Sequence, residues 1–162
     1  MWKKLQQNKI FRFIVSIIVC QLAGILGSIA TIPNVKSWYQ FLQKPGLTPP
    51  NEIFGPVWTT LYFLMGISLY LVWQSPVSKD KKKIPLVIFF VQLVMNTIWS
   101  FLFFGMHELF FSFVWIILLW LVIVINIIYF WKVSRIAGGL LIPYILWVSF
   151  ASYLNFSIWQ LN

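Results

Sequence analysis

The chain has 162 residues, of which 60% are hydrophobic and only 9% are charged, and its formal net charge is +9. Water-soluble domains carry about 25% charged residues, so this composition excludes an ordinary water-soluble globule. The length fits one domain, and we predict a single membrane domain over residues 1–162. The one cysteine, Cys20, excludes an intrachain disulfide and a cysteine metal site.

Five stretches are long and apolar enough to cross a bilayer, which takes about 20 mostly apolar residues. In chain order they cover residues 10–32, 54–73, 84–105, 109–131 and 136–161, and none has a charged residue in its middle. The first stretch follows basic residues, as a signal peptide does, but its apolar run is too long and has no convincing cleavage site. The sequence therefore predicts an all-α integral membrane protein, a bundle of five transmembrane helices.

The basic residues are divided unevenly between the two sides of such a bundle. Two of the 12 lie on one side, Lys36 and Lys44, and the others lie on the opposite side: Lys3, Lys4, Lys9, Arg12, Lys79, Lys81, Lys82, Lys83, Lys132 and Arg135. Positive charge favours the cytoplasmic side, so we predict a cytoplasmic N-terminus and a C-terminus outside. The charges then indicate topology and contact with anionic lipid headgroups, not nucleic-acid binding.

The connection between the first two helices, about 33–53, lies on the predicted outer side and is the longest in the chain. Loops beyond about 12–15 residues are usually functional or disordered. This one is rich in aromatic residues, leucine and proline, which argues against disorder.

Two predicted helices carry faces that must point into the bundle. The first has small residues at a spacing of four, Ser16, Cys20, Gly24 and Ser28, which favours close helix packing within the chain or across a dimer. On this face Cys20 is interpreted as a small buried hydrophobe. The third helix has polar residues at the same spacing, Gln92, Asn96 and Ser100. That face either makes interhelical hydrogen bonds or lines a cavity, and the pattern alone favours neither.

Depth brings several of these residues together beneath the long loop. At about 1.5 Å per residue, Trp58 and Tyr62 of the second helix lie level with Asn96 and Trp99 of the third, and with Ala151 of the fifth. A cavity lined by aromatic rings and a few amides suits a flat, apolar ligand. The loop would then form a lid over it.

The predicted spans contain no Asp, Glu, Lys, Arg or His in their middle, which disfavours ion-coupled transport. Glu52, Asp80 and Glu108 are scattered over different loops, and the lone His107 in the outer turn is interpreted as structural. We therefore expect no metal site, no cofactor and no conventional hydrolytic or redox catalysis. Oxidisable tryptophans around a light-absorbing ligand would be the only reactive resource.

Three motifs resemble the TspO/MBR family, the tryptophan-rich sensory proteins related to the mitochondrial translocator protein, or peripheral benzodiazepine receptor. The segment 38–62, WYQFLQKPGLTPPNEIFGPVWTTLY, is similar to the family signature W-Y-x-x-L-x-K-P followed by P-P, G-P-V-W and L-Y. QLVMNTIW in the third helix and PYILWVSFASYLN in the fifth resemble two further family segments. The resemblance covers nearly the whole chain.

The resemblance implies a five-helix bundle that is usually a homodimer and binds porphyrins and benzodiazepine-type drugs. It also implies a ligand-binding set for this chain: Tyr39, Pro49, Trp58, Tyr62, Asn96, Trp99, Trp147 and Ala151. Some bacterial members are linked to light-dependent porphyrin breakdown, a role that Trp58 and Trp147 would carry here. We expect a multi-pass protein of a bacterial plasma membrane.

One departure from the family concerns sterols. Animal members carry a cholesterol-recognition stretch with a Tyr and then an Arg, where this chain has Phe156 and Gln160, and such patterns are weak even when intact. Three hypotheses follow for the function: a membrane receptor, sensor or carrier for porphyrin-type tetrapyrroles; an enzyme that degrades porphyrin with light and oxygen; and a structural or regulatory partner whose cavity is only packing.

Overall fold

The computed structural model describes residues 8–162, so Lys3 and Lys4, which entered the orientation prediction, lie outside the described residues. The described chain contains five helical segments long and apolar enough to cross a membrane, as predicted. They are α2 (Lys9–Val35), α3 (Asn51–Gln74), α4 (Lys79–Ser100) with the π-helical turn η2 (Phe101–Gly105), α5 (Leu109–Val133), and α6 (Arg135–Leu140) with α7 (Ile142–Leu161).

The helices extend beyond the bounds predicted from hydropathy. Helix α4 begins at Lys79 rather than at residue 84. Lysine is a good helix former in water, so the helix extends beyond the apolar run that hydropathy detects. Helix α2 continues past Pro33 to Val35, since a proline in the last turn removes a single helix hydrogen bond. Helix α3 begins directly after Pro50. The connection between α2 and α3 is therefore residues 36–50, shorter than the predicted 33–53, and contains the 3-10 turn η1 (Tyr39–Phe41).

The fifth span is broken into two helices near its start. Helix α6 ends at Leu140 and α7 begins at Ile142, with Pro143 in its first turn, a position where the missing N–H of proline is harmless. The corner between α5 and α6 is tight: a Cβ on Gly138 would lie 3.0 Å from Cα of Trp131. Glycine is required there because the two backbones touch.

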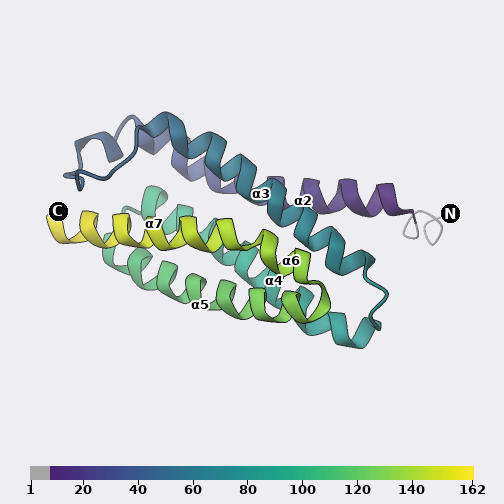
Figure 1. Ribbon diagram of the computed structural model, residues 1–162. Helices are drawn as coiled ribbons and strands as arrows, with labels where there is room; N and C mark the ends of the chain where they lie inside the picture. Colours follow the sequence, from purple (N-terminus) through teal and green to yellow (C-terminus); the bar gives the residue numbers. More distant parts are fainter. Residues whose placement is uncertain (1–7) are drawn as a thin grey trace.

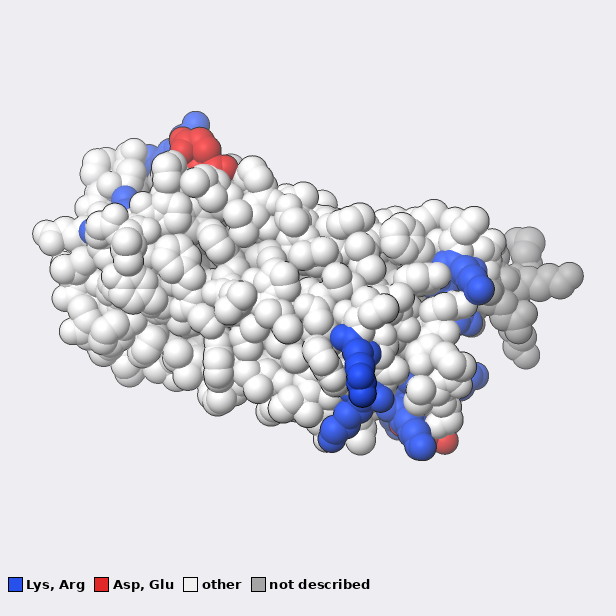
Figure 2. Space-filling view, viewed as in Figure 1, with Lys and Arg blue, Asp and Glu red and all other residues white. Residues whose placement is uncertain are grey.

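All the long helices run along the length of an elongated bundle (Figure 1). The C-terminus and the α2–α3 connection lie at one end, and the N-terminal side lies at the other. Helix α2 packs along α3, while α5 packs against both α4 and α7. Lys and Arg side chains gather mainly at the N-terminal end, with a few at the opposite end (Figure 2).

The small residues of α2 pack within the chain. Ser16 and Cys20 are fully buried, and Gly24 lies so close to Tyr62 of α3 that a Cβ would meet its ring at 2.5 Å. From the α3 side, Gly66 reaches the backbone of α2, where its Cβ would lie 2.9 Å from Cα of Ile17. These contacts join α2 and α3 tightly in the middle of the bundle.

Candidate ligand-binding site

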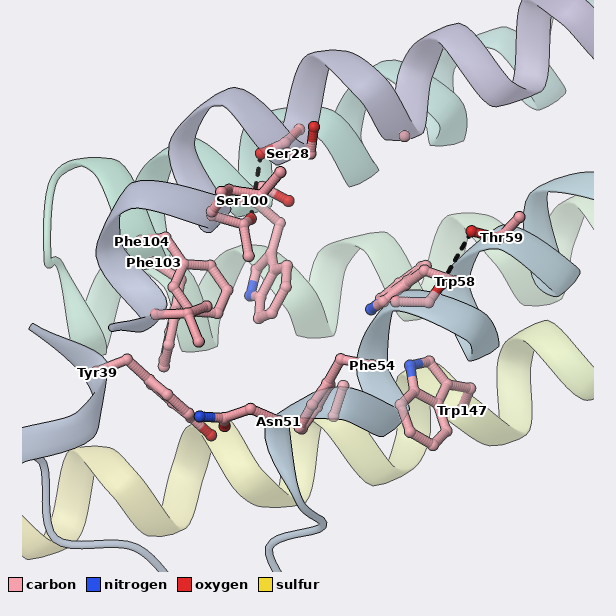
Figure 3. A pocket seen from close by; sticks show the side chains of 18 of the residues that line it. Ser28, Tyr39, Asn51, Phe54, Trp58, Thr59, Ser100, Phe103, Phe104 and Trp147 are labelled. Carbon is pink, nitrogen blue, oxygen red and sulfur yellow. Dashed lines mark hydrogen bonds between the residues drawn. The ribbon is translucent and has the colours of Figure 1, made fainter. Parts of the chain in front are cut away.

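A cavity of about 650 Å³ lies in the half of the bundle that holds the C-terminus, beneath the α2–α3 connection. This volume lies within the range of about 300–1,000 Å³ found for small-molecule sites. Helices α2, α3 and α7 and the end of α4 with η2 form its walls (Figure 3). Its lining includes Gly24, Gly27, Ser28, Tyr39, Phe54, Gly55, Trp58, Thr59, Tyr62, Trp99, Ser100, Phe103, Phe104, Trp147, Ala151, Leu154 and Asn155.

Aromatic rings from two helices line the cavity. On α3, Trp58 stacks on Tyr62 with ring centroids 5.6 Å apart. On α7, Trp147 meets Phe54 edge to face at 5.9 Å, and in Figure 3 Trp147 and Trp58 both lie on the side of the cavity away from Tyr39. Rigid rings at helical spacing of four place flat apolar surface on the cavity walls without exposing backbone polar groups.

A hydrogen-bond network lies beneath the cavity and fixes Tyr62. The Tyr62 hydroxyl donates to Oδ1 of Asn96, and Nδ2 of Asn96 donates to the Tyr144 hydroxyl at 3.1 Å. All three side chains are buried, and they join α3, α4 and α7. Asn96 thus makes the interhelical hydrogen bonds that were one of the two alternatives for its helix face, while Ser100, one turn on, lines the cavity.

A second polar link orients the indole of Trp99. Its Nε1 donates to Oδ1 of Asn155 at 3.1 Å, and Nδ2 of Asn155 donates to the Leu109 carbonyl at 3.0 Å. Trp99 also stacks on Phe103 of the π-helical turn at 5.4 Å. The extra residue in a π-helical turn shifts the following side chains around the helix, and both Phe103 and Phe104 line the cavity here.

The α2–α3 connection covers the cavity and is fastened at several points. Tyr39 is only 5% exposed and contacts the rings of Phe103 and Phe104. Burial raises the pKa of Tyr39 to about 12. Trp38 stacks on His107 at 4.1 Å, which ties the connection to the α4–α5 turn.

Asn162 fastens the other side of the connection. Its Oδ1 accepts a hydrogen bond from the backbone N–H of Gln43 at 2.9 Å. Its Nδ2 donates a hydrogen bond to the backbone carbonyl of Gln43 at 3.0 Å. The same Nδ2 donates to the carbonyl of Ile158, so the end of α7 and the connection are held together.

Six of the eight residues predicted to bind ligand line this cavity: Tyr39, Trp58, Tyr62, Trp99, Trp147 and Ala151. Pro49 and Asn96 are not among the lining residues. Pro49 lies in the covering connection, and Asn96 lies behind Tyr62 and positions it.

The α2 wall was not predicted as part of the site. Gly24 and Ser28 line the cavity, although their spacing was interpreted only as a packing stripe, and Gly27 lines it beside them. The small size of these residues could have indicated the cavity, because small side chains leave empty space wherever the neighbouring helix is further from them.

The charged side chains of the cavity lining lie at its mouth. Lys36 and Glu52 are the charged residues in the lining, and both are exposed at its mouth. Within residues 8–162, no group of three His, Cys, Asp or Glu residues is placed to hold a metal ion. The Trp147 indole N–H is buried and has no hydrogen-bond partner among these residues.

These features define a multi-pass membrane protein with a ligand-sized aromatic cavity under a structured loop. Residues 16–160 match the TspO/MBR family, and the chain belongs to that family.

Its relatives come from widely separated organisms. The chain is 42% identical to the tryptophan-rich protein TspO of Archaeoglobus fulgidus, covering 94% of this chain and 98% of that protein. It is 34% identical to the translocator protein of Sus scrofa, covering 90% and 86%. It is also 34% identical to the tryptophan-rich sensory protein of Cereibacter sphaeroides, covering 77% of each chain. Each alignment covers most of both chains.

Proposed function

We propose that this protein is a membrane receptor, sensor or carrier that binds porphyrin-type tetrapyrroles and benzodiazepine-like drugs in the cavity described above. The observation that carries the proposal is a cavity of about 650 Å³ that the indoles of Trp58 and Trp147 both line. Flat aromatic ligands gain most from such walls, because stacking adds to the burial of apolar surface. The names of two relatives, a translocator protein and a sensory protein, support this role.

The proposal includes an orientation and a location. The end that carries most of the Lys and Arg side chains faces the cytoplasm, so that the covering connection and the C-terminus lie outside a bacterial plasma membrane. The orientation can be tested with two variants that carry an introduced cysteine at position 36 or at position 81. Intact cells are treated with a membrane-impermeant thiol reagent, and its reaction with each cysteine is measured. The position-36 cysteine should react and the position-81 cysteine should not, and the reverse pattern inverts the orientation. We also propose a homodimer, for which the mass in detergent is the test.

A fluorescence titration tests ligand binding directly. Protoporphyrin added to the purified protein should quench tryptophan fluorescence saturably, and the affinity should fall in Trp58→Phe and Trp147→Phe. Trp159→Phe is the matched control, because Trp159 lies on α7 at the same end of the bundle but does not line the cavity. If the wild type shows no saturable quenching, the cavity is only packing, as the structural hypothesis holds.

A second candidate is light- and oxygen-dependent degradation of the bound porphyrin. The observation in its favour is that both tryptophans predicted for this role, Trp58 and Trp147, line the cavity. A porphyrin in the cavity would lie next to two oxidisable indoles.

Illumination separates the two candidates. An enzyme would remove the porphyrin absorption band under light, faster than free porphyrin loses it and not in the dark, and Trp58→Phe or Trp147→Phe would slow the loss. Bound porphyrin that bleaches at the rate of free porphyrin rejects the enzyme and leaves the receptor.

A further inference from the structure

Helices α2 and α3 pack tightly in the middle of the bundle but separate toward the cavity. A hydrogen bond from Nε2 of Gln21 to the Thr59 carbonyl at 3.1 Å joins them near the cavity. Because the helices are antiparallel, the next levels should pair Ile25 with Gly55, and Ser28 with Asn51. All four of these residues line the cavity.

The helices do not touch at the Gly55 level. A Cβ built on Gly55 meets no atom within 4 Å, whereas a Cβ on Gly24 or Gly66 would collide with the opposite helix. Gly55, Thr59 and Ile25 line the cavity and are exposed. The space between Gln21–Ile25–Ser28 and Asn51–Gly55–Thr59, here called the α2–α3 slot, therefore connects the cavity with the membrane-facing surface.

The hydroxyl groups that border the slot donate back to their own helices. Ser28 Oγ donates to the Ile25 carbonyl at 2.7 Å, and Thr59 Oγ1 donates to the Gly55 carbonyl at 2.9 Å. Figure 3 marks these two bonds with dashed lines. Thr31, one turn beyond Ser28, likewise donates from Oγ1 to the Gly27 carbonyl at 3.1 Å. A side-chain donor that is already paired does not have to be desolvated again when an apolar molecule passes. The hydroxyl groups of Ser28 and Thr59 are therefore already paired where they border the slot.

We propose that the α2–α3 slot is a side entrance, through which a planar apolar ligand dissolved in the bilayer enters the cavity without passing under the covering connection. The connection is fastened to η2, to the α4–α5 turn and to the end of α7, while the slot has open space beside Gly55. The identity of the ligand rests on the proposed function, but the opening to the bilayer does not.

Binding kinetics in lipid vesicles test the route with a pair of glycine variants. Gly55→Phe narrows the slot, and Gly46→Phe adds the same side chain to the covering connection, where a Cβ also meets no atom within 4 Å. With protoporphyrin loaded in the vesicles, Gly55→Phe should slow both association and dissociation by tenfold or more, and Gly46→Phe should change neither. A merely damaged site would release ligand faster, so unchanged or faster dissociation in Gly55→Phe, or equal slowing by Gly46→Phe, overturns the proposal.

Lipid access can be measured without any tetrapyrrole. In vesicles of phosphatidylcholine brominated on its acyl chains, the Trp58 fluorescence is the difference between the wild type and Trp58→Phe. Trp58 borders the cavity next to the slot, so bromine should quench this component, and Gly55→Phe should restore it when measured against a Gly55→Phe/Trp58→Phe double variant. If the Trp58 component is equally bright in brominated and ordinary lipid, the slot is closed to the bilayer, whatever the porphyrin titration shows.

Discussion

The buried amides of Asn96 and Gln92 lie one turn apart on α4, and their replacement by leucine should have opposite consequences. Asn96 accepts from the Tyr62 hydroxyl and donates to the Tyr144 hydroxyl. Gln92 is equally buried, at 1% exposed against 2%, but neither its Oε1 nor its Nε2 has a hydrogen-bond partner within residues 8–162. One amide links three helices, and the other makes no such link.

The magnitudes follow from these partners. Hydrogen bonds between membrane helices contribute about 0.6 kcal/mol on average and at most about 1.7 kcal/mol, and a buried polar group left unpaired costs about 1–3 kcal/mol. Asn96→Leu breaks two bonds, so we expect the free energy of unfolding to fall by roughly 1–4 kcal/mol. Gln92→Leu removes a buried amide that has no bond to lose, so stability should stay within about 0.5 kcal/mol or rise.

Unfolding in mixed micelles with increasing SDS, followed by circular dichroism, measures both changes. A Tyr62→Phe/Tyr144→Phe background supplies the control, because the two partner hydroxyls are then absent and Asn96→Leu should cost less than in the wild type. The reasoning is refuted if Asn96→Leu and Gln92→Leu lose the same stability, or if the loss at Asn96 is unchanged in the double-phenylalanine background.

Three further predictions concern the helix contacts and the covering connection. Gly66→Ala should lower the free energy of unfolding by about 1–3 kcal/mol, because the added Cβ clashes with the α2 backbone. Gly55→Ala should raise it by about 0.5–1 kcal/mol, because its Cβ meets no atom and alanine favours the helix. Unfolding in SDS measures the free energy for both variants. Because burial raises the pKa of Tyr39 from 10 to about 12, the folded connection favours the neutral phenol. Its packing should be unaffected below pH 10 and weaken as the pH rises toward 12, seen as a tyrosinate absorbance step that Tyr39→Phe lacks. Asn162→Ala removes both hydrogen bonds to Gln43, so hydrogen exchange at the Gln43 amide should become several-fold faster; an unchanged rate would show that this contact does not hold the connection.

Much of the fold could be predicted from local properties of the sequence. Long apolar runs mark the spans, because a bilayer requires about 20 apolar residues whatever the neighbouring helices do. The inward direction of Gln92 and Asn96 was also predictable, because a side-chain amide that faces lipid leaves its donors and acceptors unpaired at a cost in free energy. The helix ends were less predictable: Lys79–Lys83 form the first turn of α4 outside the apolar run, and hydropathy does not detect them.

The details of the site depend on how helices tilt against one another, which no single segment encodes. The stripe on α2 that includes Gly24 and Ser28 predicts close packing, and Gly24 does pack against Tyr62. One turn further on, α2 and α3 have separated, and Ser28 lines a cavity instead. The role of Asn96 was hidden for a similar reason, because its partner Tyr144 comes from another helix 48 residues away.

The most direct test of the central claim, that a planar ligand occupies this cavity, is protoporphyrin binding to the wild type beside Ala151→Leu. Ala151 is 8% exposed and lines the cavity on the same α7 face as Trp147, so a larger side chain there occupies ligand volume. We predict saturable binding to the wild type and an affinity at least tenfold weaker for Ala151→Leu of unchanged helicity. Equal affinity of the two proteins, or quenching that never saturates, would contradict the account.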